Sequence, residues 1–345
     1  MIRFECDYAE GAAPQILERL TQTNLEQTPG YAVDKHCQRA RELIREACGA
    51  PQAAVEFLVG GTQTNQTVIS AALRPYQGVL CAQTGHINTH ETGAIEATGH
   101  KVLALPSQDG RITPEQVERF CAARWADPTR EHTVQPGMLY LSQPTETGLL
   151  YSRAELEGFR AVCGRYGMYL YIDGARCGYG LAAPGNDVEL TDLARLTDVF
   201  YIGGTKVGAL FGEAVVISNP ALQRDFRYCI KRHGGMLAKG RLLGLQFEAL
   251  FEDNLYRQLG RHGVEQALRI REACLRRGLS LHFASHTNQQ FPILTREQQA
   301  HLEKKYTFTL WEPLDDGRAV VRFCASWATD PAAVDALTAD LLSLP

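Results

Sequence analysis

From about residue 34 to residue 217 the sequence alternates short apolar runs with amphipathic stretches of helical periodicity. Such alternation is typical of strand–helix units around a mostly parallel sheet, in which the strands are buried on both faces. Seven runs are long enough to form strands, so we predict one large α/β domain with a seven-stranded sheet. The predicted strands are residues 55–59, 78–82, 101–105, 138–142, 169–172, 199–202 and 213–217.

Two of the predicted helices in this region have recognisable ends. Ser152 and Glu155 have the spacing of a capping box, and Gly167 can end the same helix. Thr113 and Gln116 have the same spacing at the start of another helix. These signals indicate where helices begin between the predicted strands.

The pattern changes near residue 240, where longer helical stretches replace the alternation. We predict helices over 240–254 and 256–277 and a last helix from residue 331. This indicates a small α+β domain over residues 241–345, after a large domain over residues 1–240 that includes an N-terminal arm of about 20 residues. Short strands are expected near residues 280–284, 289–294, 306–311 and 319–324.

Composition narrows the class of protein. The chain is 45% hydrophobic and 21% charged, so it can bury a full core, and disordered and fibrous classes are excluded. Its 35 basic and 39 acidic residues are interleaved, which disfavours nucleic acid and membrane surfaces and favours a small-molecule partner. Ten scattered cysteines without metal spacing, and no leader or membrane-spanning run, lead us to expect a cytoplasmic protein with free thiols.

Two predicted strands end in side chains of complementary chemistry. Asp173 follows the strand at 169–172, and Lys206 follows the strand at 199–202 after a Gly-Gly-Thr turn. The carboxyl ends of parallel strands line the crevice in which α/β proteins bind ligands, so both groups are expected to face one cleft. Pyridoxal 5'-phosphate (PLP) needs an amine to form a Schiff base and a carboxylate to keep its ring nitrogen protonated. Alone, Asp173 could instead cap a turn and Lys206 could be a solvated loop residue.

Three further segments can contribute to such a cleft. Residues 60–65 (GGTQTN) lie between a strand and a helix, where free N–H groups favour an anion, although a plain turn explains them equally well. This segment lacks the nucleotide-binding motifs. His86 follows the strand at 78–82 and could stack on a ring or be an ordinary polar loop residue. His90 and Glu91 have no third ligand at suitable spacing, so we predict no metal site.

Two arginines are candidates for binding a carboxylate. Arg176 comes three residues after Asp173, and Arg322 lies inside the apolar run VVRFCA. A guanidinium in an apolar strand is costly unless it meets an anion. An amino acid substrate would supply that anion, while an internal salt bridge remains the alternative.

These residues, taken together, resemble the threonine aldolase and β-eliminating lyase family of fold type I PLP-dependent enzymes. The similar phrases occur in the family's order and extend through most of the chain. They are Asp7-Tyr8-x-Glu10-Gly11, GGTQTN at 60–65, GHIN at 85–88 with Glu91, SQPTETG at 142–148, YIDGAR at 171–176 and FYIGGTK at 200–206.

The resemblance implies specific roles for the cofactor site. Lys206 is expected to bind the cofactor as a Schiff base, Asp173 to pair with the ring nitrogen and His86 to stack on the ring and take part in catalysis. Gly61 and Thr62 are expected to contact the phosphate. The resemblance places three further cofactor contacts at Gln63, Arg176 and Thr205.

The resemblance also implies a substrate site and an assembly. Asp7, Arg176 and Arg322 are expected at the substrate, the last two at its carboxylate. Homodimers or homotetramers with sites between subunits are expected, and the run at 231–235 (KRHGG) would reach a neighbour's phosphate.

Two positions depart from the family pattern. Thr145 stands where many aldolases have a histidine, so proton transfer is expected to differ. Residues 4–8 replace an arginine and serine that many members have near the substrate carboxylate.

The implied activity is cleavage of L-threonine, L-allo-threonine or a related β-hydroxy-α-amino acid to glycine and an aldehyde, with His86, or a water that it orders, as base. Two alternatives remain open. One is β-elimination from another amino acid by the same cofactor, and the other is a non-catalytic phosphate- or nucleotide-binding α/β protein.

Overall fold

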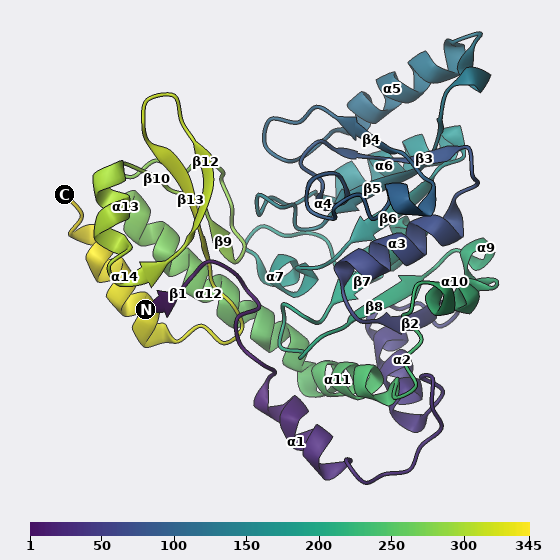
Figure 1. Ribbon diagram of the computed structural model, residues 1–345, viewed down its shortest axis with the longest axis horizontal. Coiled ribbons are helices and arrows are strands. Elements are labelled where there is room, and N and C mark those ends of the chain that lie inside the picture. Colours follow the sequence, from purple (N-terminus) through teal and green to yellow (C-terminus); the bar gives the residue numbers. More distant parts are fainter.

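The computed structural model describes residues 1–345 and shows a large α/β part beside a smaller α+β part (Figure 1). The large part contains a seven-stranded sheet in the order β2-β8-β7-β6-β5-β3-β4. All of its strands are parallel except β8, which runs antiparallel to both of its neighbours. The strands are β2 (Ala54–Leu58), β3 (Gln77–Ala82), β4 (Val102–Leu105), β5 (Gln135–Ser142), β6 (Tyr169–Asp173), β7 (Val199–Gly203) and β8 (Glu213–Ile217).

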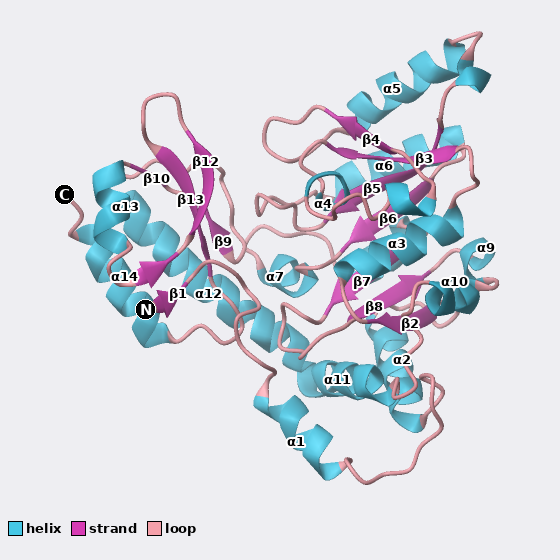
Figure 2. Ribbon diagram, in the orientation of Figure 1, coloured by secondary structure: helices cyan, strands magenta, loops and turns pink.

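The sheet confirms the fold class and all seven predicted strands of the large domain. Every residue of β7 and β8 is buried, which explains why these runs are apolar on both faces, apart from Glu213 at the start of β8, rather than alternating. Helices cover both faces of the sheet (Figure 2). The helices of the large part are α2 (Lys35–Ala47), α3 (Gly61–Ala72), α4 (His86–Thr89), α5 (Pro114–Ala126), α6 (Arg153–Tyr166), α7 (Cys177–Ala182), α8 (Leu190–Leu196), α9 (Pro220–Gln223), α10 (Phe226–Arg232) and α11 (Arg241–Phe251).

Two separate apolar cores hold the helices on the sheet. One core joins Val68 and Ile69 of α3 and Phe226 and Ile230 of α10 to one face of the sheet. The other core packs α2, α5, α6, α8 and α11 on the opposite face. Burial of this apolar surface stabilises the layers and fixes where the strand ends lie.

The predicted helix ends are confirmed. Ser152 and Glu155 form a capping box at the start of α6, and Gly167 ends this helix with a left-handed φ of 65°. Thr113 and Gln116 form the same box at the start of α5.

The smaller part is built on an antiparallel sheet in the order β10-β13-β12, with β9 also paired to β13. The N-terminal strand β1 pairs in parallel with β11. The strands are β1 (Ile2–Arg3), β9 (Gln289–Gln290), β10 (Ile293–Leu294), β11 (Tyr306–Thr307), β12 (Thr309–Pro313) and β13 (Ala319–Cys324). The remaining helices are α1 (Pro14–Gln22), α12 (Leu255–Arg276), α13 (Arg296–Leu302) and α14 (Pro331–Leu342), with 3-10 turns at Glu96–Thr98, Arg130–His132 and Glu252–Asn254.

Three predicted strands of the small part are wrong in detail. Residues 280–284 form only an isolated bridge between Leu281 and Pro292. Beyond it the chain leaves the sheet, because the Ser285 and Thr287 hydroxyls donate to the Gly148 carbonyl of the large part at 3.2 Å. The predicted strand at 289–294 is split into β9 and β10. That at 306–311 is split because β11 pairs with β1 while β12 pairs with β13.

Three contacts cross the predicted division at residue 240. Helix α11 packs against α2 of the large part, and β1 of the predicted N-terminal arm belongs to the small part. Helix α12 joins the two parts by packing on both α7 and α14. None of the helices combines the length and the apolar character that crossing a membrane requires.

Candidate active site

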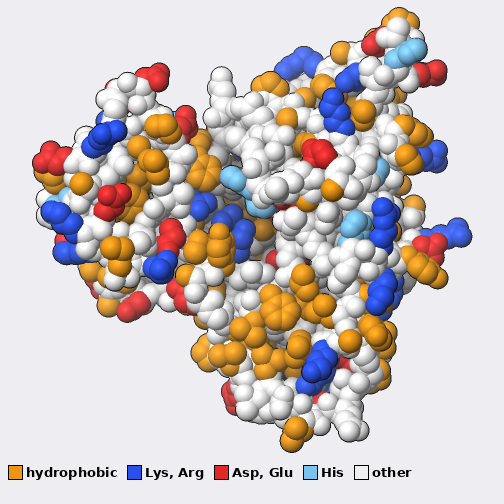
Figure 3. Space-filling model, in the orientation of Figure 1, with side chains coloured by type: hydrophobic (Ala, Val, Ile, Leu, Met, Phe, Trp, Pro, Cys, Tyr) orange, Lys and Arg blue, Asp and Glu red, His pale blue; other side chains and the backbone are white.

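Two adjoining cavities lie at the carboxyl edge of the large sheet. The inner cavity, of about 330 Å³, lies over the strand ends. The outer cavity, of about 500 Å³, opens between the two parts, where the surface is hollowed (Figure 3). Five residues line both cavities: Tyr8, His86, Glu146, Arg176 and Lys206.

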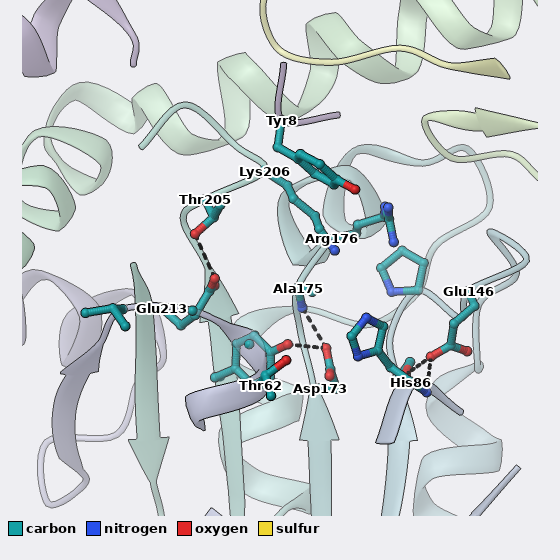
Figure 4. Close-up of a pocket in the computed structure, with 16 residues that line it drawn as sticks. Tyr8, Thr62, His86, Glu146, Asp173, Ala175, Arg176, Thr205, Lys206 and Glu213 are labelled. Carbon is teal, nitrogen blue, oxygen red and sulfur yellow. Dashed lines mark hydrogen bonds between the residues drawn. The ribbon is translucent and has the colours of Figure 1, made fainter. Parts of the chain in front are cut away.

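The strand ends bring the predicted cofactor residues together at the inner cavity (Figure 4). Asp173 is the last residue of β6, and Lys206 lies three residues beyond β7. His86 begins α4, four residues after β3, and Gly61 begins α3, three residues after β2. The prediction that Lys206 and Asp173 face one cleft is therefore confirmed by the geometry.

The Asp173 carboxylate is buried and held by hydrogen bonds alone. The hydroxyls of Tyr140 and Tyr201 each donate to it at 2.5 Å, and Ala175 N donates at 3.0 Å. Asn65 Nδ2 donates at 3.3 Å. Burial raises the pKa of both tyrosines well above their ordinary value, so they stay neutral donors. No basic side chain forms an ion pair with this carboxylate, which leaves its charge free to act on a ligand.

Lys206 reaches the same cavity with an amine that forms no hydrogen bond or ion pair in the structure. Its backbone is held in place, because the Tyr179 hydroxyl donates to the Lys206 carbonyl at 2.5 Å. Burial and the positive charge of Arg176 lower the pKa of the Lys206 amine below its ordinary value. A lowered pKa increases the fraction of neutral amine, which is the nucleophilic form.

His86 belongs to a buried hydrogen-bond network. Its Nδ1 lies 2.7 Å from Glu91 Oε1, and the same oxygen accepts from Asn65 Nδ2 at 2.7 Å. Burial alone would lower the pKa of His86, but the bond to Glu91 and the negative charge of Asp173 outweigh it and raise the pKa. Glu91 thus orients the ring and leaves Nε2 without a protein partner.

The start of α3 forms the wall of the inner cavity opposite Lys206. Gly60, Gly61 and Thr62 line it, and the N-terminal N–H groups of this helix have no acceptor within the helix. The helix dipole favours an anion at this position. Thr205 also lines the cavity, and its hydroxyl donates to Glu213 Oε1 at 2.9 Å.

Arg322 faces the outer cavity without a carboxylate partner. Its Nη2 donates to the Glu5 carbonyl at 2.9 Å, its Nη1 donates to Gln289 at 3.2 Å, and its guanidinium lies 5.3 Å from the centroid of the Trp311 ring. Its Nε is buried and has no acceptor. The internal salt bridge considered for Arg322 is therefore not formed, and the guanidinium charge is available to an anion in the cavity.

Comparison with known proteins decides the family. The sequence model of the family described as beta-eliminating lyase matches residues 4–297. The chain belongs to the beta-eliminating lyase family. A low specificity L-threonine aldolase from Pseudomonas sp. strain NCIMB 10558 is 30% identical to this family member over 348 residues, with 98% of this chain and 96% of the relative covered. That from Pseudomonas aeruginosa is 29% identical, with the same shares covered.

Solved structures agree with this assignment. The threonine aldolase of Leishmania major superposes on this beta-eliminating lyase family member with a TM-score of 0.96 and 43% sequence identity, covering 99% of this chain and 98% of that one. An aspartate aminotransferase of Thermus thermophilus superposes with a TM-score of 0.72 at 14% identity, covering 99% and 91%. The second likeness shows the shared fold, which is that of fold type I.

The residues of this family member fit the PLP that its family and fold imply. The test is the chemistry of the cavity itself. It offers the amine of Lys206 and the carboxylate of Asp173, both without an ionic partner, and the N-terminal helix end at Gly61. PLP presents an aldehyde, a ring nitrogen and a phosphate, which are the three groups that these residues would bind.

Two predicted contacts of this family member are turned away from the cavities. The Gln63 side chain lines neither cavity, because its amide bonds to Val59 N at 3.1 Å and to the His233 carbonyl at 3.0 Å. In place of the predicted cofactor contact, the Gln63 side chain makes hydrogen bonds to the backbone of the protein. Gln63 thereby joins the segment at 231–235, which was expected to reach a neighbour's phosphate, to the start of α3.

Asp7 is the other prediction that needs correction. It lines neither cavity, is fully buried, and accepts from Arg176 Nε at 2.6 Å and from Asn288 at 2.9 Å. Burial alone would raise the pKa of Asp7, but the charges of Arg176 and Lys206 lower it to about 2. Asp7 therefore positions Arg176 through Nε and Nη2 and leaves Nη1 without a protein partner.

Two carboxylates that line the inner cavity, Glu146 and Glu213, were not predicted from the sequence. Glu146 accepts from the Ser142 hydroxyl at 2.6 Å and from His86 N at 3.0 Å, and burial raises its pKa. It follows Thr145, whose hydroxyl bonds to Thr147 at 2.9 Å and lines neither cavity. Its position after a strand end could have identified Glu146. Glu213, which begins β8, could be found only once the direction of that strand was known.

Proposed function

We propose that this family member is a PLP-dependent lyase that cleaves L-threonine, L-allo-threonine or a related β-hydroxy-α-amino acid to glycine and an aldehyde. The observation that carries the proposal is the juxtaposition of Lys206 and Asp173, both without ionic partners, in one cavity at the sheet edge. The likeness to threonine aldolases over almost the whole chain supports the choice of reaction.

In the proposed site, Lys206 would hold the cofactor through its amine and Asp173 would keep its ring nitrogen protonated. Gly61, Thr62 and Thr205 would surround the phosphate, and His86 would lie against the ring. When bound, the cofactor withdraws the electron pair of the substrate bond that breaks.

The substrate carboxylate would bind in the outer cavity. Arg322 offers a guanidinium that is held only by neutral acceptors and an aromatic ring. Arg176 offers Nη1 while Asp7 fixes its other nitrogens. These two guanidinium groups on different parts of the chain would hold the amino acid with its side chain towards His86.

His86 is the proposed base that removes the proton from the substrate's β-hydroxyl. The Glu91 carboxylate keeps the proton of neutral His86 on Nδ1, so that Nε2 can accept one. Because the pKa of His86 is raised, the neutral form is populated only above this raised pKa. Activity should therefore fall as pH decreases through it.

Glu91→Gln is expected to lower kcat by about 10²-fold, because removing the carboxylate weakens control of the His86 tautomer. It should also move the acidic limb of the kcat/KM profile to lower pH, since the interaction that raises the pKa of His86 is lost. Steady-state rates from pH 5 to 9 measure both effects. Exposed Glu96→Gln is the matched control. An unchanged acidic limb in Glu91→Gln would rule out this role.

Product analysis tests the proposed reaction directly. L-Threonine and L-allo-threonine should yield equal amounts of glycine and acetaldehyde, because only the Cα–Cβ bond breaks. The purified protein with PLP is incubated with each amino acid and with L-serine, and glycine, aldehyde, pyruvate and ammonia are measured. Pyruvate and ammonia without glycine from L-serine would instead favour β-elimination, which the family description keeps as the second candidate.

The homodimer or homotetramer implied by the resemblance remains part of the proposal. Large apolar side chains are exposed on the segment that follows α1 and on α10, and they would be covered in an assembly. They include Leu25, Tyr31, Val33 and Tyr228. The KRHGG run at 231–235 adjoins them, and the mass of the particle in solution would test the assembly.

A further inference from the structure

Glu213 is an acidic residue in the inner cavity, where the proposed function requires the phosphate of the cofactor to bind. It is the first residue of β8, and because β8 is antiparallel it lies beside Gly203, at the edge where β7 ends. Its side chain lines the inner cavity together with Gly61, Thr62 and Lys206. Figure 4 shows Glu213 and Thr205 joined on the side of the cavity away from His86.

The contacts of Glu213 leave its charge unneutralised. Its Oε2 accepts from Gly204 N at 3.1 Å and its Oε1 accepts from the Thr205 hydroxyl at 2.9 Å. It is 4% exposed and forms no ion pair. Both donors belong to the loop that carries Lys206, so Glu213 fastens that loop from the neighbouring strand.

The groups that act on Glu213 favour its neutral form. Burial and the negative charge of Asp173 together raise the pKa of Glu213 to about 8, although the charge of Lys206 and the hydrogen bonds from Thr205 and Gly204 act to lower it. The other titratable groups whose environment includes Glu213 are the buried phenols of Tyr171, Tyr201 and Tyr256. Lys206 is thus the one cation acting on it, and the proposed function commits Lys206 to the cofactor.

We propose that Glu213 is protonated whenever the phosphate of the cofactor is bound, and that any ionised fraction of Glu213 takes up a proton on binding, so that a neutral carboxyl group faces the phosphate from β8. The inference rests on the proposed function. A carboxylate and a phosphate dianion in one buried cavity repel each other, and adding a proton from solvent to one carboxylate oxygen removes that repulsion. The neutral carboxyl group can still accept from Gly204 and can donate to the Thr205 hydroxyl.

Proton uptake on binding tests the proposal without any turnover. The probe is pyridoxine 5'-phosphate, which has no aldehyde and so cannot react with Lys206, and the reference ligand is unphosphorylated pyridoxine. The phosphate of pyridoxine 5'-phosphate has a second pKa of about 6 and is already a dianion at pH 8. Full-length protein freed of cofactor is titrated calorimetrically at pH 8 in two buffers of different ionisation enthalpy. The difference in heat between the buffers gives the number of protons taken up.

The wild type should take up about 0.5 proton more with the phosphorylated ligand than with pyridoxine, because a group with a pKa near 8 is half ionised at this pH. Glu213→Gln is neutral at every pH and keeps one donor and one acceptor, so this extra uptake should vanish. Above pH 8 the wild-type affinity for pyridoxine 5'-phosphate should fall up to about tenfold per pH unit relative to that of Glu213→Gln.

The outcomes separate this inference from the proposed function. Tight binding with equal uptake in both proteins would overturn the role of Glu213 and leave the cofactor site intact. Failure of both ligands to bind would overturn the cofactor site and the inference with it. If Glu213→Gln does not fold, the wild-type comparison of the two ligands decides alone, since equal uptake with and without phosphate contradicts the proposal.

Discussion

Lys206→Ala is expected to lose the visible absorbance of the bound cofactor and at least about 10³-fold in kcat. The reason is that Lys206 is the only amine that lines the inner cavity, so no other group can bind the cofactor covalently. The absorbance spectrum of the purified variant and the rate of acetaldehyde formation from L-threonine measure the two effects. Added methylamine should restore a small part of the rate by replacing the missing amine.

Lys101→Ala provides the matched control. Lys101 is exposed and immediately precedes β4, at the opposite edge of the same sheet, so its loss removes a lysine of the large part without touching the cavities. Its colour and rate should equal those of the wild type. A Lys206→Ala protein that keeps both colour and activity would contradict the cofactor site.

Asp173→Asn is expected to keep the colour but lower kcat by about 10²- to 10³-fold. The amide has no negative charge with which to hold a proton on the ring nitrogen, so the cofactor withdraws electrons less strongly. It also presents an NH₂ group to one of the Tyr140 and Tyr201 hydroxyls, each of which donates to a different oxygen of the carboxylate in the wild type. Rates under saturating cofactor, together with the absorbance spectrum, separate weak chemistry from weak binding.

A second buried aspartate controls for the loss of a charge inside the protein. Asp198 is also 4% exposed, but it lies at the opposite sheet edge, where it accepts from Arg160 at 2.6 Å and from Leu170 N at 2.7 Å. Asp198→Asn should lower stability while leaving kcat within a few-fold of the wild type. Equal losses of kcat in both variants would point to general destabilisation.

Much of the large part could be predicted because its strands are buried on both faces. Residues 199–203 and 214–217 are buried and correspondingly apolar, so the positions of both strands were visible in the sequence. The rule that parallel strands end at one edge then placed Asp173, Lys206 and His86 together. Local order along the chain was enough for these three residues.

Side-chain direction was not contained in the same patterns. Gln63 and Thr62 are neighbours at the start of α3, yet only Thr62 lines the cavity, since Gln63 bonds to His233 far along the chain. Asp7 was placed near the substrate, but its partners are Arg176 and Asn288. These choices depend on tertiary contacts that no local spacing indicates.

The small part was less predictable because its strands are short and pair with distant segments. The sequence from 306 to 311 reads as one strand, but its first two residues pair with β1 at the other end of the chain. A two-residue strand has no periodicity to detect. Pairing between segments about 300 residues apart can be known only from the folded structure.

The loop that carries Lys206 is the connection of a β-hairpin, because Gly203 of β7 pairs with Glu213 of β8. Successive side chains of a strand point to opposite faces, so adding or removing one residue in β8 would exchange the side chains that it presents to the two apolar cores on either side of the sheet. Gly208 and Gly212 have φ values of 95° and 125°, which other residues rarely adopt. An insertion in this hairpin would therefore have to be accommodated in the loop between the two strands, because one inside β8 would move Glu213 to the other face of the sheet.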